Sequence, residues 1–285
     1  MQLVPQTAAK PALDFDPSSK TAKQVLADSP LVILCGGKGT RLREETEWKP
    51  KPMVNVGDWP ILWHIMRYYS CFGVRKFILC LGYKGQVIRD FFLSYHERCA
   101  DVRIELGKNH VSYVGDSYVG DDWEIVLANT GLDTLTGGRV RAVNKYIESP
   151  TFFLTYGDGL SNVNLEALVQ RHIDRKRIGT VTAVRPASRF GELLLDDGKV
   201  NAFQEKPQIS DGWVSGGFFV MNKAIFDYLP DPDVSLEQAP LQKLTQDGQL
   251  SVYEHEGFWQ CIDTYRELEY VEKLWAKEQA PWKIW

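Results

Sequence analysis

The stretch LVILCGGKGTR, residues 31–41, decides the fold of this 285-residue chain. Its first five residues are all apolar, which is typical of a strand buried on both faces of a parallel sheet. Three glycines follow, and glycines let backbone N–H groups approach an anion because they carry no Cβ. Lys38 and Arg41 add positive charge. The stretch therefore predicts a buried strand that ends in an anion-binding loop.

This loop differs from both common phosphate-binding patterns. A Walker A loop that began at Gly36 needs its second glycine at position 41, which is occupied by Arg41. A dinucleotide fingerprint counted from Gly37 needs a third glycine at position 42, which is Leu42. A tight glycine turn without a ligand stays open as an alternative.

A second basic element, Lys49-Pro50-Lys51-Pro52, follows the loop. Its two prolines fix an extended path, so the lysines are held out from the backbone and do not enter a helix. Alone, a solvated basic loop explains this element as well as a ligand site does. Because both basic elements follow the same predicted strand, together they favour a polyphosphate ligand.

Strand-sized apolar runs alternate with segments of helical spacing along the rest of the chain. The expected strands are 31–35, 76–81, 102–106, 124–128, 152–156 and 180–184. The expected helices are 61–72, 86–99, 139–148, 165–176 and 265–277. Such alternation predicts an α/β fold with a mostly parallel sheet and helices on both faces.

The two ends of this pattern differ from its centre. Residues 1–29 are polar and allow only one short helix, near residues 22–27. They lack the basic start and apolar run of a signal peptide, so we expect an arm that is flexible or lies on a neighbouring subunit. From residue 185 to about 257, shorter runs and Asp-Gly turns predict a smaller α+β extension of the same domain.

The composition argues against several classes of protein. The net charge is −4, and the lysines and arginines are scattered, so we expect no nucleic-acid partner. The apolar runs are far shorter than a membrane span. The five cysteines form no CxxC pair, which favours reduced thiols in a cytoplasmic protein. The five histidines have no metal spacing, and His64 fits a helix core better than a ligand site.

Two aspartates are candidates for a metal site. Asp158 follows the apolar run 152–156 within Tyr-Gly-Asp-Gly, and an aspartate at the carboxyl end of a strand can hold a hard cation that bridges phosphates. A simple turn is an equally good explanation, since Asp-Gly is common in turns. Asp263 precedes the last helix, where an N-cap is the better explanation if the residue is taken alone.

A third candidate lies in the extension. Glu205-Lys206-Pro207 follows a strand-like run, 200–203. A glutamate can accept hydrogen bonds from sugar hydroxyls, and a lysine can pair with a sugar phosphate. Charged residues before a proline also occur in ordinary surface turns, and that alternative stays open.

These motifs, taken in order, resemble those of the nucleotidyltransferases that activate sugar 1-phosphates, and most closely the glucose-1-phosphate cytidylyltransferases. The resemblance covers nearly everything after residue 30. It rests on GGKGTR (36–41), KPKPM (49–53), TGGR (136–139), YGDG (156–159), RFG (189–191), QEKP (204–207), GGFF (216–219), FWQ (258–260) and APWK (280–283).

The resemblance implies a fold, an activity and partners. It implies a Rossmann-like, GT-A-like core, with a nucleotide-binding part over about 30–184 and a sugar-binding and C-terminal part over about 185–285. It implies that CTP and glucose 1-phosphate give CDP-glucose and pyrophosphate with Mg²⁺, in a homo-oligomer, a hexamer. Use of UTP or dTTP by the same fold, and a nucleotide-sugar sensor without catalysis, remain as alternatives.

The resemblance also implies roles for individual residues. Arg41 and Lys51 would neutralise charge on the reacting phosphates, and Asp158 and Asp263 would hold Mg²⁺. The implied nucleotide site is Gly36, Gly37, Gly39, Thr40, Arg41, Lys51, Asp158 and, touching the base, Arg139. The implied sugar site is Arg189, Gly191, Glu205, Lys206, Ser215 and Gly216.

The sequence departs from the family pattern at three places. Trp59 replaces a basic residue, and Leu236 replaces the tryptophan of a Trp-Glu-x-x-Pro-Leu motif. Ser215 stands where the family carries a sugar-contacting asparagine. A serine offers fewer hydrogen-bonding groups on a shorter side chain, so we expect weaker discrimination among hexose 1-phosphates.

Overall fold

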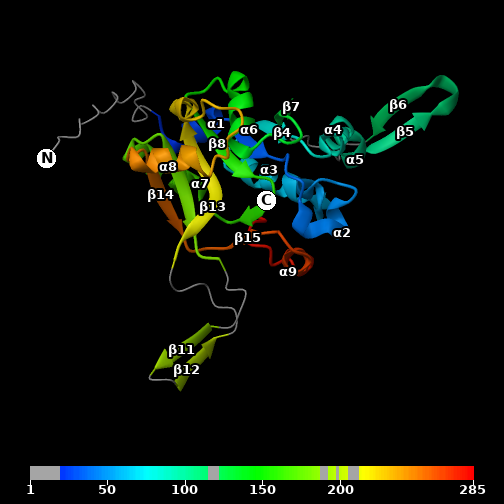
Figure 1. The fold of residues 1–285 in the computed structure, drawn as a ribbon. Helices are drawn as coiled ribbons and strands as arrows, with labels where there is room; N and C mark the ends of the chain where they lie inside the picture. Colours follow the sequence, from blue (N-terminus) through cyan, green and yellow to red (C-terminus); the bar gives the residue numbers. More distant parts are fainter. Residues whose placement is uncertain (1–19, 115–121, 187–191, 197–198, 205–211) are drawn as a thin grey trace.

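The computed structural model describes residues 20–114, 122–186, 192–196, 199–204 and 212–285. A seven-stranded sheet with helices on both faces lies at its centre (Figure 1). The strand order is β14-β10-β13-β8-β1-β4-β7. Their bounds are Leu31–Leu34 (β1), Lys76–Leu81 (β4), Glu124–Asn129 (β7), Thr151–Tyr156 (β8), Gly179–Val184 (β10), Val214–Asn222 (β13) and Leu250–His255 (β14). Within the described residues, β13 is the one strand of this sheet that runs antiparallel to its neighbours. The predicted α/β class is confirmed.

Strand β1 lies inside the sheet, between β4 and β8. Its four residues are at most 8% exposed, and they alternate between two apolar clusters. Leu31 and Ile33 pack on one side, with helices α1 (Ala22–Asp28), α3 (Ile61–Cys71), α4 (Gly85–Leu93), α7 (Leu165–Arg175) and α9 (Tyr265–Ala276). Val32 and Leu34 pack on the other, with α6 (Thr136–Ala142) and α8 (Ala239–Gln246). Burial on both faces explains the continuous apolar run.

Three of the predicted elements differ in the structure. The predicted helix 139–148 begins earlier and ends earlier, as α6, and a 3₁₀ turn over Asn144–Tyr146 follows it. The run 102–106 forms β5 (Asp101–Glu105), which pairs with β6 (His110–Val114) in a hairpin outside the central sheet. Its residues alternate, with Ile104 opposite Val111 and Arg103 opposite Ser112, and this alternation suits a hairpin with one apolar face. The predicted helix 86–99 is interrupted at Ser94, which separates α4 from α5 (Tyr95–Cys99).

Three other two-stranded antiparallel pairs complete the described part of the fold. β2 (Asn55–Val56) pairs with β3 (Trp59–Pro60), and β9 (Gly159–Ser161) pairs with β15 (Trp259–Cys261). β11 (Glu192–Asp196) pairs with β12 (Lys199–Gln204), and Figure 1 shows this hairpin projecting from the sheet. Strands β13 and β14 come from the predicted extension but complete the central sheet.

Helix α1 lies within the segment predicted as an arm. Thr21 caps it in a capping box with Gln24, and Val25 and Leu26 are buried. The helix contacts α7, so residues 22–28 belong to the folded core, whereas residues 1–19 lie outside the described residues. Within the described residues, no helix is long and apolar enough to cross a membrane.

The C-terminal tail closes one side of the core. Trp282 is fully buried and its Nε1 donates to Nδ1 of His64 at 3.4 Å, while Nε2 of His64 lies 2.9 Å from the carbonyl of Val56. Burial lowers the pKa of His64 to about 4. The prediction that His64 is a core residue is confirmed.

Candidate active site

A pocket of about 640 Å³ opens at the carboxyl ends of β1 and β8, where ligands bind in open α/β sheets. Every predicted site residue that the structure describes lines this pocket: Gly36, Gly37, Gly39, Thr40, Arg41, Lys51, Arg139, Asp158, Ser215, Gly216 and Asp263. Arg189, Gly191, Glu205 and Lys206 lie outside the described residues. The sequence motifs therefore converge on one cavity.

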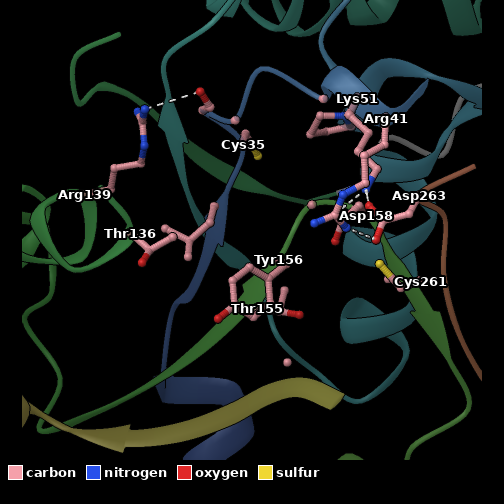
Figure 2. Close-up of a pocket in the computed structure, with 18 of the residues that line it drawn as sticks. Cys35, Arg41, Lys51, Thr136, Arg139, Thr155, Tyr156, Asp158, Cys261 and Asp263 are labelled. Carbon is pink, nitrogen blue, oxygen red and sulfur yellow. Dashed lines mark hydrogen bonds and ion pairs between the residues drawn. The ribbon is translucent and has the colours of Figure 1, made fainter. Parts of the chain in front are cut away.

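A cluster of two cations and two carboxylates occupies one end of the pocket (Figure 2). Lys51 Nζ lies 2.6 Å from Oδ2 of Asp158 and 2.5 Å from Oδ1 of Asp263. Nη1 of Arg41 lies 2.7 Å from Oδ2 of Asp263. Two positive and two negative side chains thus balance one another without a ligand.

Each member of this cluster is placed by a local feature of the chain. Pro50 has extended backbone angles and starts a short 3₁₀ turn, Lys51–Met53, which directs the lysine inward. Asp158 lies two residues after the end of β8. Asp263 is not the N-cap of α9, because Thr264 caps that helix in a capping box with Glu267. The carboxylate of Asp263 is therefore available to the pocket.

Burial and pairing act in opposite directions on the charges of this cluster. Burial opposes the positive charge of Lys51, but Asp158 and Asp263 outweigh it and raise the pKa of the lysine. Burial also opposes the charge of Asp263, but Lys51 and Arg41 outweigh it and lower the pKa of that carboxyl. Both groups are consequently charged near neutral pH.

The two aspartates fit a hard divalent cation. They bracket the ammonium group of Lys51, so the pair is already arranged around a positive charge. Carboxylate oxygens are the ligands that Mg²⁺ and Mn²⁺ prefer. The donor atoms of Asp158, Asp263 and Cys261 all lie within 4.8 Å of one another.

The glycine loop, residues 36–41, forms part of the pocket lining. Gly39 has a φ of +61°, a left-handed conformation that favours glycine. A Cβ on Gly37 would meet nothing within 4 Å, so the loop surface is accessible to a ligand there. Lys38 instead pairs with Asp133 at 2.8 Å, with 55% of its side chain exposed.

Arg139 is buried, with an exposed fraction of 5%, and is directed at the backbone. Its guanidinium donates to the carbonyls of Gly36, Leu81, Gly131 and Leu132 at 2.8–3.3 Å. A Cβ on Gly36 would lie 2.1 Å from its Nη1, so the first glycine of the loop leaves room for this arginine. Figure 2 shows Arg139 away from the carboxylate cluster. These contacts tie the loops that follow β1 and β7 to the last residue of β4.

Glu237 binds three side chains that line the pocket, and it was not among the predicted site residues. Its carboxylate accepts hydrogen bonds from Thr136 Oγ1 and Ser235 Oγ, both at 2.6 Å, and from the hydroxyl of Tyr156. Burial alone would raise its pKa, but these hydrogen bonds outweigh burial and lower it. The signal was present, because Glu237 is the glutamate of the Trp-Glu-x-x-Pro-Leu motif.

The predicted sugar-site residues that the structure describes, Ser215 and Gly216, lie on β13. Ser215 pairs with Ala183 of β10 and faces the pocket, and the carbonyl of Gly216 accepts a hydrogen bond from Trp259 Nε1 at 2.8 Å. Gly217 has a φ of +76°, and a Cβ there would lie 2.5 Å from the ring of Tyr156. The glycines therefore let this strand come close to the pocket wall.

Known proteins match this chain over most of its length. Residues 31–275 match the family model for nucleotidyl transferases. A Bacillus subtilis protein named "Probable glucose-1-phosphate cytidylyltransferase" is 46% identical over 255 residues, which are 89% of this chain and 99% of that protein. The glucose-1-phosphate cytidylyltransferase of Salmonella typhi is 44% identical over 255 residues, which are 89% of this chain and 98% of that enzyme.

The same fold occurs in a solved structure. The crystal structure of HddC from Yersinia pseudotuberculosis superposes with a TM-score of 0.63 at 24% identity, over 87% of this chain and 99% of that one. Together with the pocket, the family model and the relatives lead to one assignment. The chain belongs to the nucleotidyltransferase family, among relatives of the glucose-1-phosphate cytidylyltransferase type.

Proposed function

We propose that this enzyme transfers the cytidylyl group of CTP to glucose 1-phosphate, giving CDP-glucose and pyrophosphate. The relatives named for this reaction, at 44–46% identity, support both substrates. The observation that carries the proposal is the cluster in which Asp158 and Asp263 bracket Lys51, beside a glycine loop at the carboxyl ends of the strands. It combines what phosphoryl transfer needs, namely positioning and charge neutralisation.

In this proposal, the triphosphate lies over the loop 36–41. Asp158 and Asp263 would hold a divalent cation, Mg²⁺ in our proposal, which neutralises charge on the phosphates when bound. The carboxylates then no longer hold Lys51 and Arg41, whose positive charges are free to contact phosphate oxygens. Before the substrates bind, the two carboxylates thus pair with Lys51 and Arg41, the side chains that are later to contact phosphate.

The attacking group is an oxygen of the sugar phosphate, which displaces pyrophosphate from the α-phosphorus in line. That oxygen is already anionic at neutral pH, so no side chain has to remove a proton. The main task of the protein is to hold the two anionic substrates together and to stabilise the charge of the transition state.

Arg139 shapes the nucleotide end of this site in our proposal, through its contacts with the loop carbonyls. Ser215 and Gly216 are proposed to contact the hexose, because they line the pocket beside Tyr156. Arg189, Gly191, Glu205 and Lys206 keep the sugar-binding roles implied by the family motifs, as proposals only. We likewise propose a homo-oligomer, on the family resemblance alone.

The experiment is an assay of pyrophosphate release across CTP, UTP, dTTP, ATP and GTP with several hexose 1-phosphates. CTP with glucose 1-phosphate is expected to give the highest kcat/KM. Asp158→Asn and Asp263→Asn should each lower kcat by orders of magnitude, since a bound cation contributes several kcal/mol to catalysis. Higher turnover with UTP or dTTP would replace the proposed nucleotide, and no turnover with any pair would favour a sensor. Circular dichroism controls for the fold of each variant.

A further inference from the structure

Cys261 lies beside the two proposed metal ligands, although no motif assigns it a role. Its Sγ and the carboxylate oxygens of Asp158 and Asp263 are within 4.8 Å of one another. Figure 2 shows the sulfur directed toward the two carboxylates. The cysteine also lines the pocket that holds the carboxylates, so a pocket ligand can reach it.

The backbone fixes this arrangement. Cys261 ends β15 and pairs with Gly159 of β9, the residue next to Asp158. The N–H of Ile262 donates to the carbonyl of Asp158 at 2.9 Å. The thiol is therefore held next to the carboxylates by strand pairing, and its position does not depend on a flexible loop.

A thiol in this position matters for some cations and not for others. Mg²⁺ is a hard cation that takes oxygen ligands, so a sulfur atom adds nothing to its binding. Zn²⁺ and Cd²⁺ accept thiolates together with carboxylates. A soft cation that binds there takes the sulfur as a thiolate, releases the thiol proton to solvent and gains a third protein ligand.

We infer that Asp158, Asp263 and Cys261 form a site for a thiophilic divalent cation, which competes with the catalytic cation and inhibits the enzyme. This inference rests on the proposed function, because it assumes that the two carboxylates hold the catalytic cation. A thiolate ligand takes one coordination position and offsets one positive charge of the cation. The cation then has fewer coordination positions and less positive charge available for the phosphates, so turnover falls.

The first test uses Co²⁺ as a spectroscopic probe on the metal-free full-length protein under reducing conditions. Wild type should develop a saturable thiolate-to-cobalt charge-transfer absorption in the near ultraviolet, at one Co²⁺ per chain. Cys261→Ser should lose this absorption, whereas Cys99→Ser, a change of another partly buried cysteine, should keep it. An absent band in wild type, or a band that survives in Cys261→Ser, overturns the inference.

The second test measures Zn²⁺ inhibition of Mg²⁺-supported turnover, each variant relative to its own rate without zinc. Cys261→Ser should raise the half-inhibitory Zn²⁺ concentration by at least about 10-fold, since losing even an outer-shell partner typically costs about 10- to 100-fold in metal affinity. An unchanged half-inhibitory concentration would remove Cys261 from the site. A failure of the proposed function looks different, because Asp158→Asn would then keep Mg²⁺-supported turnover whatever the cobalt spectrum shows.

Discussion

Replacing Arg139 with alanine is expected to lower the free energy of unfolding by about 3–5 kcal/mol. Arg139 is 5% exposed, and its guanidinium donates to four backbone carbonyls and to Thr130 Oγ1. A hydrogen bond from a charged donor contributes about 1.5–3 kcal/mol, but the carbonyls beside the pocket regain water when the side chain is removed. The expected loss of unfolding free energy is therefore that of one broken buried network, which is smaller than the sum of its individual hydrogen bonds.

This destabilisation should be measured by chemical denaturation and by the melting temperature. For a chain of this size, 3–5 kcal/mol corresponds to a drop in Tm of about 6–20 °C. Arg141→Ala is the matched control, because Arg141 lies on the same helix but is exposed, and its effect should stay within about 0.5 kcal/mol. The resemblance makes a different prediction for Arg139, namely a higher KM for CTP with unchanged stability.

A double-mutant cycle with Gly36 sharpens the test. Gly36→Ala alone places a Cβ 2.1 Å from Nη1 of Arg139, so the arginine must move. With Arg139→Ala already present, the three atoms nearest to the added methyl group are gone, so the substitution should cost less. A coupling of about 0.5–3 kcal/mol is expected from two residues in contact. Full additivity, together with unchanged stability of Arg139→Ala, would refute the role of Arg139 as a support of the loop.

Three further predictions concern the pocket charges, the sugar and the buried histidines. Lys51→Ala should lower kcat/KM by about 100-fold or more, because it removes a charge-assisted contact to the phosphates. Lys38→Ala should lower it less, because Lys38 pairs with Asp133 on the surface, and the reverse order would contradict this phosphate placement. Ser215→Asn should sharpen the preference for glucose 1-phosphate over its epimers by about tenfold and leave the nucleotide preference unchanged. Equal selectivity of the two proteins in competition assays would remove Ser215 from the sugar site. Burial lowers the pKa of His64 and of His172 to about 4, below the unfolded value near 6.5, so both stabilise the fold above pH 6.5. About 1–3 kcal/mol for each should be lost as the pH falls from 6.5 toward 4, and a flat unfolding free energy over that range would contradict the assignment.

The sequence by itself predicted the parts of the fold that depend on local pattern. Strand β1 was evident from its apolar run, because each of its residues is buried on one face of the sheet or the other. The loop 36–41 and the lysine of residue 51 were evident because glycine widens the backbone conformations available and proline restricts them wherever they occur. The eleven site residues that the motifs predicted and the structure describes all line one pocket.

Local pattern was insufficient where a role depends on a distant partner. Taken alone, Asp263 fitted an N-cap better than a metal ligand, but in the structure Thr264 takes the cap and Asp263 lines the pocket. Arg139 matched a base-binding position, but the carbonyls around its guanidinium come from the last residue of β4 and from the loops after β1 and β7. The segment 102–106 resembled a strand of the central sheet and instead pairs with β6.

The sequence thus determined the fold class and the chemical groups of the site, because apolar spacing, glycine and proline act over a few residues. Only the tertiary structure decided which of those groups meet. The contact of Lys51 with both Asp158 and Asp263 requires β8 to lie beside β1 and β15 to pair with β9. The same pairing brings Cys261 to the carboxylates. These contacts depend on strand register between distant segments, which no short stretch of sequence specifies.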